Sequence, residues 1–75
     1  MLILYSTDGC HLCELAEQLL RASASATAEG WEVVDIALDD ALFERYGWSI
    51  PVVKAESGAE LAWPFDPDGL ADFLS

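Results

Sequence analysis

Short blocks of apolar residues, each followed by polar or turn residues, run along the chain and predict alternating strands and helices. Residues 2–5 are apolar on both faces, which is typical of a buried central strand. Beyond a turn at residues 8–9, apolar side chains recur three and four positions apart, as on one face of a helix. That face is expected to carry Leu12, Leu15, Ala16, Leu19 and Leu20. The pattern fades in the small-residue segment 22–28, which either continues the helix or frays, and Gly30 ends it.

Three further strands are predicted in the rest of the chain. Residues 31–36 are rich in Val, Ile and Trp and lack the spacing of a helix. Residues 50–54 and 60–63 are the other two candidates, and the polar turn at residues 57–58 lies between them. A turn this short predicts that these last two strands form an antiparallel hairpin.

Two further helices are each predicted to begin at an aspartate, whose carboxylate can accept hydrogen bonds from the free N–H groups of the first turn. Asp39 is the expected cap of the first of these helices, and Gly47 its end. The expected apolar contacts of this helix are Leu42, Phe43 and Tyr46. Asp66 caps the last helix, with Pro67 at the first helical position. The buried face of that helix is expected to carry Leu70, Phe73 and Leu74.

The predicted order of elements is therefore β-α-β-α-β-β-α. Strands that alternate with helices call for parallel crossovers, and the terminal hairpin adds an antiparallel edge. The compact solution is an α/β fold with a four-stranded mixed sheet and helices on both of its faces. A chain of 75 residues leaves room for one domain, spanning residues 1–75.

The charge of the chain excludes several classes of function. Fourteen acidic residues against three basic ones give a net charge of −11, which opposes binding to nucleic acid and to anionic membranes. No stretch is long enough to cross a membrane, and the apolar start is too short for a targeting core. We therefore expect an acidic, cytoplasmic protein that binds neither nucleic acid nor membrane and is a monomer.

The candidate chemistry lies in two cysteines, Cys10 and Cys13, which follow the first strand and begin the first helix. A disulfide that closes so short a loop stabilises a fold by only about 2 kcal/mol, so the spacing favours chemistry over stapling. In a reducing cytoplasm such a pair is more often catalytic, redox-sensing or metal-binding than structural. Reversible dithiol–disulfide exchange is the first interpretation of this pair.

Three other interpretations stay open. The two cysteines could be unreactive thiols of the core, because free cysteine is often buried. They could instead bind zinc or an iron–sulfur cluster together with His11, although one chain supplies no fourth ligand and a dimer would be required. The chain could also be a redox-inert binding module. For a single chain on its own, no resident metal or cofactor is expected.

Three segments carry a resemblance to a known family. They are residues 9–13 (GCHLC), 33–36 (VVDI) and 46–52 (YGWSIPV). With the order of elements, they make the chain similar to the small bacterial glutaredoxin-like proteins, which have the thioredoxin fold. The resemblance implies a thiol–disulfide oxidoreductase whose Ile50–Pro51 peptide bond is cis and faces the two cysteines. A proline there has no N–H, and the backbone of Ile50 would be left to pair with an incoming peptide or glutathione.

The expected roles of the site residues follow from their positions. Cys10 would lie at the helix N-terminus, where unpaired N–H groups stabilise a thiolate, and would be the exposed nucleophile. Cys13, one turn further, would be the resolving thiol. His11 would either tune the nucleophile or face solvent without a direct role. Trp48 would either line the substrate groove, beside Ile50 and Pro51, or simply pack.

The expected substrate is a disulfide of a protein or small molecule, with glutathione or a thioredoxin system as reductant. Two departures from a typical glutaredoxin bear on the choice of reductant. Asp8 stands where a basic residue commonly precedes the first cysteine, and residues 63–65 (WPF) replace a pair of glycines. Glutathione is an anion, and the charges of Asp8 and Glu14 oppose both its binding and thiolate formation at the neighbouring sulfurs.

Overall fold

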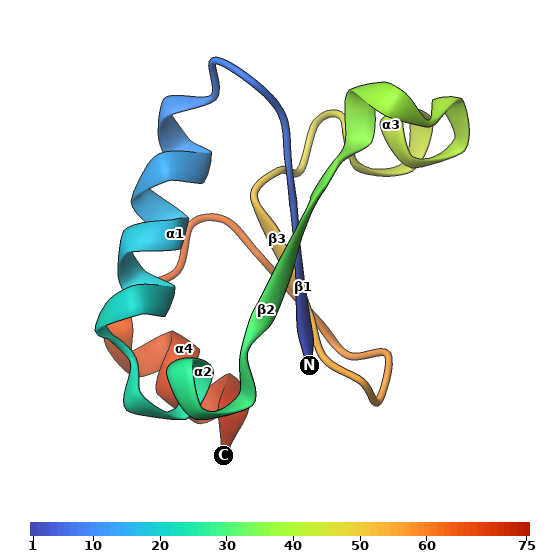
Figure 1. Cartoon of the computed structure of the whole chain (residues 1–75). Helices are drawn as coiled ribbons and strands as arrows, with labels where there is room; N and C mark the ends of the chain where they lie inside the picture. The colour runs from blue at the N-terminus through green and yellow to red at the C-terminus, as the bar shows by residue number, and fades with distance from the viewer.

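The chain forms four strands and four α-helices, and the computed structural model describes all residues, 1–75. In chain order the elements are β1 (Leu2–Ser6), α1 (His11–Ala22), α2 (Ala24–Glu29), β2 (Trp31–Asp35), the 3₁₀ turn η1 (Ile36–Leu38), α3 (Asp40–Tyr46), β3 (Val52–Lys54), β4 (Glu60–Ala62) and α4 (Pro67–Leu74). The strands form one mixed sheet in the order β2-β1-β3-β4. Helices α1, α2 and α4 lie on one side of this sheet and α3 on the other (Figure 1). The predicted fold class, an α/β fold with helices on both faces of a four-stranded sheet, is confirmed.

Strand β1 is the central strand, and its neighbours run in opposite directions. It pairs in parallel with β2, with Leu4 opposite Val33, and antiparallel with β3, with Leu4 opposite Val53. β3 and β4 form the predicted antiparallel hairpin, with Val53 opposite Leu61. The expectation of parallel crossovers is correct for β1 and β2 but wrong for β3.

The position of α3 explains the direction of β3. This helix lies at the end of the sheet where β2 finishes (Figure 1). Its seven residues advance the chain by only about 10 Å. The chain therefore enters β3 from the end of the sheet that it has just left, and β3 runs antiparallel to β1 and β2.

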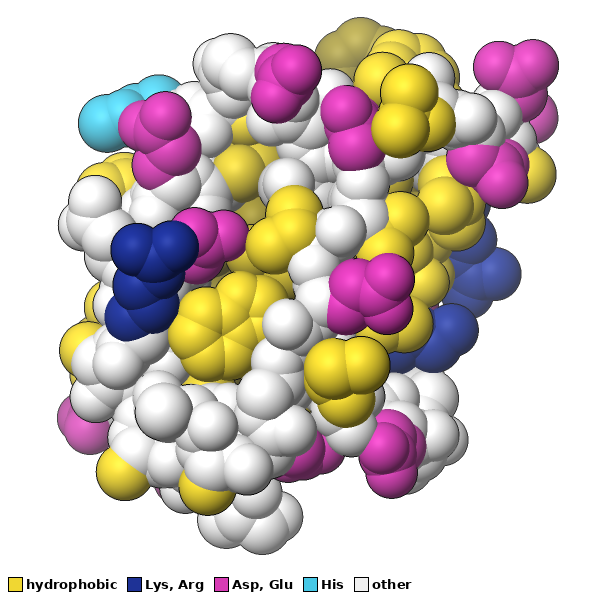
Figure 2. Space-filling model, viewed as in Figure 1, with side chains coloured by type: hydrophobic (Ala, Val, Ile, Leu, Met, Phe, Trp, Pro, Cys, Tyr) yellow, Lys and Arg dark blue, Asp and Glu magenta, His cyan; other side chains and the backbone are white.

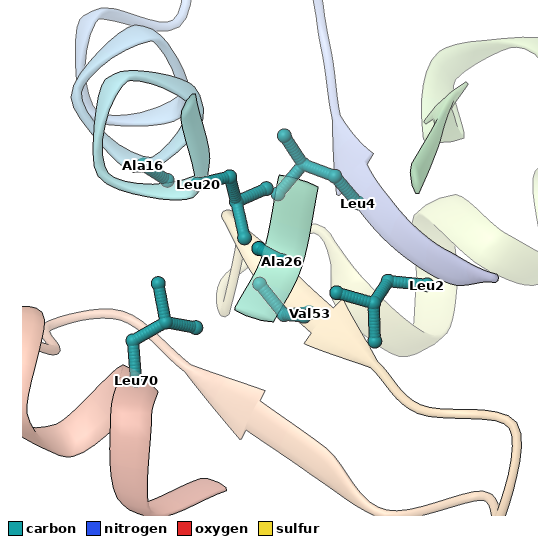
Figure 3. Packing of buried hydrophobic residues seen from close by; sticks show 7 residues of the cluster. All are labelled: Leu2, Leu4, Ala16, Leu20, Ala26, Val53 and Leu70. Atoms are coloured by element: carbon teal, nitrogen blue, oxygen red, sulfur yellow. The ribbon is translucent and has the colours of Figure 1, made fainter. Parts of the chain in front are cut away.

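The larger hydrophobic core lies between the sheet and the helices α1, α2 and α4, which share one of its sides. Its fully buried members point toward one another from five elements (Figure 3): Leu2, Leu4, Ala16, Leu20, Ala26, Val53 and Leu70. On α1 the face that meets the sheet carries Cys13, Ala16 and Leu20. Leu12 was expected on this face, but it is 44% exposed, because it lies about 80° around the helix from Leu20.

A smaller core lies on the other side of the sheet, under α3. It consists of Tyr5, Ile36, Tyr46 and Val52. Tyr46 is buried and Leu42 packs against this core, as predicted, because the two residues are one helical turn apart. The prediction for Phe43 is wrong: its side chain is 58% exposed, because a residue next to Leu42 points about 100° away around the helix.

The predicted starts of α3 and α4 are confirmed by the hydrogen bonds of their capping aspartates. The Asp39 carboxylate accepts hydrogen bonds from the N–H groups of Ala41 and Leu42, at 2.9 and 3.2 Å. Asp66 accepts one from Gly69 at 2.7 Å. The small-residue segment neither continues α1 nor frays. It forms the separate helix α2, because the Ser23 hydroxyl caps a new first turn.

Acidic side chains dominate the charged surface. Figure 2 shows them spread over the end of the molecule that carries, in Figure 1, the β1–α1 loop and α3. None of the helices has both the length and the apolar character that crossing a bilayer requires.

Candidate functional site

The cysteines, α3 and the Ile50–Pro51 bond lie at one end of the sheet. β1 and β2 are parallel, so both finish at this end, and the antiparallel β3 begins there. The β1–α1 loop leads from β1 to Cys10, α3 follows β2, and Ile50–Pro51 leads into β3. Figure 1 shows the β1–α1 loop and α3 at this same end. The topology therefore brings the cysteine pair and the Ile50–Pro51 segment, which are far apart in the sequence, to the same end of the sheet.

Cys10 and Cys13 are joined by a disulfide, with their Cα atoms 5.2 Å apart. Cys10 is the N-cap of α1, and its Sγ accepts a hydrogen bond from the backbone N–H of Cys13 at 3.2 Å. The turn before it depends on Gly9, whose backbone φ of 72° is one that residues with a side chain rarely adopt. Cys13 is only 5% exposed, whereas Cys10 is half-buried. Of the two sulfur-bearing residues, Cys10 is thus the more accessible.

The backbone around Cys10 is arranged to favour a negative charge on its sulfur once the disulfide is reduced. The N-terminal turn of α1 directs unpaired N–H groups and the positive end of the helix dipole toward this position. The same interaction lowers the pKa of cysteines at helix N-termini in general. The arrangement can therefore support a thiolate at Cys10.

A hollow of about 170 Å³ lies beside the pair and is strongly acidic. Its lining residues are Leu4, Ser6, Thr7, Asp8, Gly9, Cys10, Cys13, Glu14 and Glu17. Three of them carry carboxylates, and none is Lys or Arg. Glu17 forms an i, i+4 ion pair with Arg21 at 2.6 Å. The charges of Asp8 and Glu14 were expected beside the cysteines from the sequence. Ser6, Thr7 and Glu17 also line the hollow, and no residue pattern indicated them.

His11 lies on the exposed side of α1, next to Cys10. Its Nδ1 is 3.6 Å from a carboxylate oxygen of Glu14, which makes an ion pair only when the imidazole is protonated. Both side chains are largely exposed. His11 does not line the hollow, so its position is at the rim of the site.

The Ile50–Pro51 peptide bond is cis, and Pro51 is buried. A second cis bond, Trp63–Pro64, was not anticipated from the sequence. The expectation that the backbone of Ile50 is free is wrong for its N–H, which donates to the carbonyl of Tyr46 at 3.1 Å, because the chain turns tightly after α3. No protein group donates to the Ile50 carbonyl oxygen. Neither residue lines the acidic hollow.

Trp48 is completely exposed, so it does not pack into the core. It lines a second hollow, of about 250 Å³, together with Phe43 and Gly47. Of the two alternatives for Trp48, the structure excludes packing. An indole left in water at the end of the sheet that carries the cysteines is available for contact with another molecule.

The Tyr46 hydroxyl donates a hydrogen bond to the Glu60 carboxylate, which joins α3 to β4 and was not anticipated from the sequence. The Tyr46 ring stacks on Tyr5, with centroids 4.3 Å apart, and the guanidinium of Arg45 lies 5.4 Å from its centroid. Burial, followed by the hydrogen bond to Glu60, raises the pKa of Tyr46 to about 12. The only signal in the sequence was the tyrosine that opens the segment YGWSIPV.

The Tyr46–Glu60 bond predicts a loss of stability at alkaline pH. The pKa of Tyr46 is higher in the folded chain than the ordinary value of 10.0, so its contribution is complete below pH 10 and disappears as pH rises toward about 12. Near neutral pH, Tyr46→Phe should cost about 0.5–1.5 kcal/mol of unfolding free energy. Urea unfolding of both proteins across this pH range measures the difference, which should shrink above pH 10. A difference that stays constant would contradict this role for the hydroxyl.

No group of three or more His, Cys, Asp or Glu side chains in the structure is arranged to hold a metal ion. The two cysteines are engaged with each other in the disulfide. The metal alternative would therefore need reduced cysteines and ligands from a second chain.

Comparison with known proteins gives matches over the whole chain. A family model described as "Glutaredoxin-like domain (DUF836)" matches residues 1–75. The X-ray structure of protein XcR50 from X. campestris is 42% identical, with a TM-score of 0.87 over 99% of this chain and 95% of that one. The solution structure of Ne2328 from Nitrosomonas europaea is 29% identical, with a TM-score of 0.77 over 99% of this chain and 89% of that one.

Partial matches also occur to larger proteins. A 2-C-methyl-D-erythritol 4-phosphate cytidylyltransferase from Synechococcus sp. (strain CC9902) is 47% identical over 51 residues, which are 67% of this chain and 21% of that protein. The protein of the same name from Prochlorococcus marinus (strain MIT 9313) is 41% identical over 51 residues. The match spans about a fifth of the length of each of these relatives. The likeness therefore concerns one segment of a longer protein.

Proposed function

Because the chain belongs to the family of glutaredoxin-like domains (DUF836), we propose that it is a thiol–disulfide oxidoreductase in which Cys10 attacks and Cys13 resolves. Its fold is thioredoxin-like, as is that of small proteins with high structural similarity to it. The family supports a redox-type function in general, and the assignment of the steps to particular sulfurs is the proposal.

One observation carries the proposal: Cys10 caps α1 and accepts a hydrogen bond from the N–H of its own partner, Cys13. This bond places the accessible sulfur where a thiolate is favoured and keeps the second sulfur within bonding distance of it. Two inert core thiols would need neither the cap position nor the difference in exposure between the two residues. The arrangement therefore supports a nucleophile and a resolving thiol.

The proposed reaction begins with the reduced dithiol. The Cys10 thiolate attacks one sulfur of the substrate disulfide, forms a mixed disulfide and releases the other substrate sulfur as a thiolate, which takes up a proton. The Cys13 thiol then loses its proton and attacks Cys10 Sγ. The second substrate sulfur leaves as a thiol, and the Cys10–Cys13 disulfide remains. Two electrons pass from the protein to the substrate, which ends as two thiols.

The end of the sheet offers one acceptor for aligning the substrate. The carbonyl oxygen of Ile50 receives no hydrogen bond from the protein, whereas its N–H is occupied by Tyr46. We propose that a backbone N–H of the substrate donates to this carbonyl, which would hold an extended segment beside Cys10. The pairing would be one-sided, because Ile50 has no free donor to offer in return.

A second reductant must regenerate the dithiol. We propose a cytoplasmic setting, where glutathione and thioredoxin systems supply electrons by the same exchange chemistry. The acidic hollow disfavours anionic glutathione, since no basic residue lines it.

Redox equilibration tests the proposal. The oxidised protein is incubated separately with a glutathione buffer and with a thioredoxin system, and alkylation of the free thiols reports the fraction reduced. We expect reversible two-electron reduction of the Cys10–Cys13 pair, and faster reduction by the thioredoxin system than by glutathione. A pair that neither system reduces, or purified protein that carries zinc or iron on these cysteines, would contradict the oxidoreductase assignment.

A further inference from the structure

We propose that the disulfide reduced at this site belongs to a cationic segment of another protein, whose basic side chains lie beside Asp8 and Glu14 and whose apolar side chain covers Trp48. The proposal rests on the oxidoreductase function proposed above and names its substrate class. It depends on the charges around the dithiol and on the exposed aromatic surface at the same end of the sheet.

The charge beside the dithiol is negative and only partly neutralised. Glu17 is paired with Arg21, but Asp8 and Glu14 are exposed and have no Lys or Arg partner. The remaining neighbour that could carry positive charge is His11, 3.6 Å from Glu14. The entrance to the disulfide thus attracts cations and repels anions.

The chain has no other basic group to offer an anionic substrate. None of its three Lys and Arg residues lines the acidic hollow or the aromatic one. Arg21 is held by Glu17, Arg45 lies over the Tyr46 ring, and Lys54 pairs with Ile3 near the start of β1, at the opposite end of the sheet. A substrate whose own carboxylates must be neutralised, such as glutathione disulfide, would find no partner here.

The exposed aromatic surface argues for a protein rather than a small molecule. Trp48 and Phe43 line a hollow that shares no residue with the acidic one. Both hollows lie at the end of the sheet where β1 finishes and β3 begins. A small disulfide needs only the hollow beside the cysteines, whereas an extended segment, which advances by about 3.3 Å per residue, continues beyond it along the same end of the sheet.

The aromatic hollow has an acidic border as well. Glu44 follows Phe43 on α3 and is exposed, and Asp39 and Asp40 are exposed at the start of the same helix. Arg45 on the same helix offsets one of these three carboxylates, so the border stays net acidic and favours an occupant that combines an apolar side chain with positive charge. Both hollows favour a positively charged occupant, so we assign both to one segment of the partner protein.

Matched substrates test the proposal. Two peptides with the same disulfide and the same central Leu differ only in their flanking residues, which are Lys in one and Glu in the other. Neutral 2-hydroxyethyl disulfide is the third substrate. At low ionic strength we expect kcat/KM for the Lys peptide to exceed that for the Glu peptide about tenfold or more, and the ratio to fall as salt is added.

Charge variants locate the effect. Asp8→Asn combined with Glu14→Gln should reduce the Lys-to-Glu ratio by about fivefold or more. Asp68→Asn combined with Asp72→Asn removes the same number of charges from α4 and should leave the ratio intact, because α4 lies far from the β1–α1 loop (Figure 1).

An aromatic variant tests the second contact. Trp48→Ala should raise KM for the Lys peptide about fivefold more than it raises KM for 2-hydroxyethyl disulfide, since one buried aromatic contact is lost. Val33→Ala, at an exposed apolar side chain on β2, is the control and should change neither value.

The outcomes separate the two proposals. Turnover of 2-hydroxyethyl disulfide with equal rates for both peptides would overturn the substrate class and leave the oxidoreductase function standing. A Lys preference that the α4 variant weakens as much as the site variant would also overturn it, because net charge alone would then be the cause. Failure to reduce any of the three substrates would overturn the function itself, and the substrate class with it.

Discussion

Replacing Cys10 with serine should lower the rate of disulfide reduction by at least about a thousandfold, because a neutral hydroxyl replaces the only accessible thiolate. In the structure Cys10 is the N-cap of α1, a position where serine is also favoured. The variant should therefore keep its fold, and its thermal unfolding should stay within a few degrees of the parent. The measurement is turnover of 2-hydroxyethyl disulfide with a chemical reductant in excess.

Cys13→Ser is the matched control and should behave differently. The first attack by Cys10 remains, but no second thiol can release the product, so a mixed disulfide accumulates. Mass spectrometry under non-reducing conditions should show one substrate half bound to the Cys13→Ser protein and none to the Cys10→Ser protein. The reverse pattern would show that the buried sulfur attacks first, against the exposures of the two residues.

Leu20→Ala should cost about 2–5 kcal/mol of unfolding free energy, because it leaves a cavity among side chains that cannot collapse fully. Leu20 is completely buried between α1 and the sheet, in contact with the core of Figure 3. In a domain of this size, such a loss corresponds to a decrease in Tm of at least about 10 °C.

Leu12→Ala, on the same helix, is the control for this substitution. Its side chain is 44% exposed, so the same change of residue type should cost less than about 1.5 kcal/mol. Thermal unfolding followed by circular dichroism compares the two variants. Equal losses of stability would contradict the difference in burial between Leu20 and Leu12.

Much of the fold could be predicted from the sequence because its signals are local. Asp39 and Asp66 cap helices through hydrogen bonds that span only two or three residues, so the residue type at one position was sufficient. Gly30 has a φ of 78°, which explains why a glycine follows the Ala-rich segment. The cysteine pair could be placed for the same reason, since a strand, a turn and a helix start follow one another directly along the chain.

The features that were not predicted depend on contacts between segments far apart in the sequence, or on how far around a helix a residue lies from the sheet. The Tyr46–Glu60 bond joins α3 to a strand fourteen residues away, and nothing in either segment indicates the other. Leu12 and Phe43 satisfied the apolar spacing, but spacing does not say how far the sheet extends over a helix. The N–H of Ile50 is occupied because the chain turns back on α3, a contact that a motif cannot show.

The order of the strands also bears on how the protein behaves in concentrated solution. β2 is an outer strand of five residues, and one row of its backbone donors and acceptors faces away from β1. Such an edge can recruit a second copy and seed aggregation. Glu32 places an exposed carboxylate on this strand, and the net charge of −11 adds repulsion between whole molecules. The acidity that we propose to select a basic partner at one end of the sheet thus also repels other copies of the protein from its exposed edge strand.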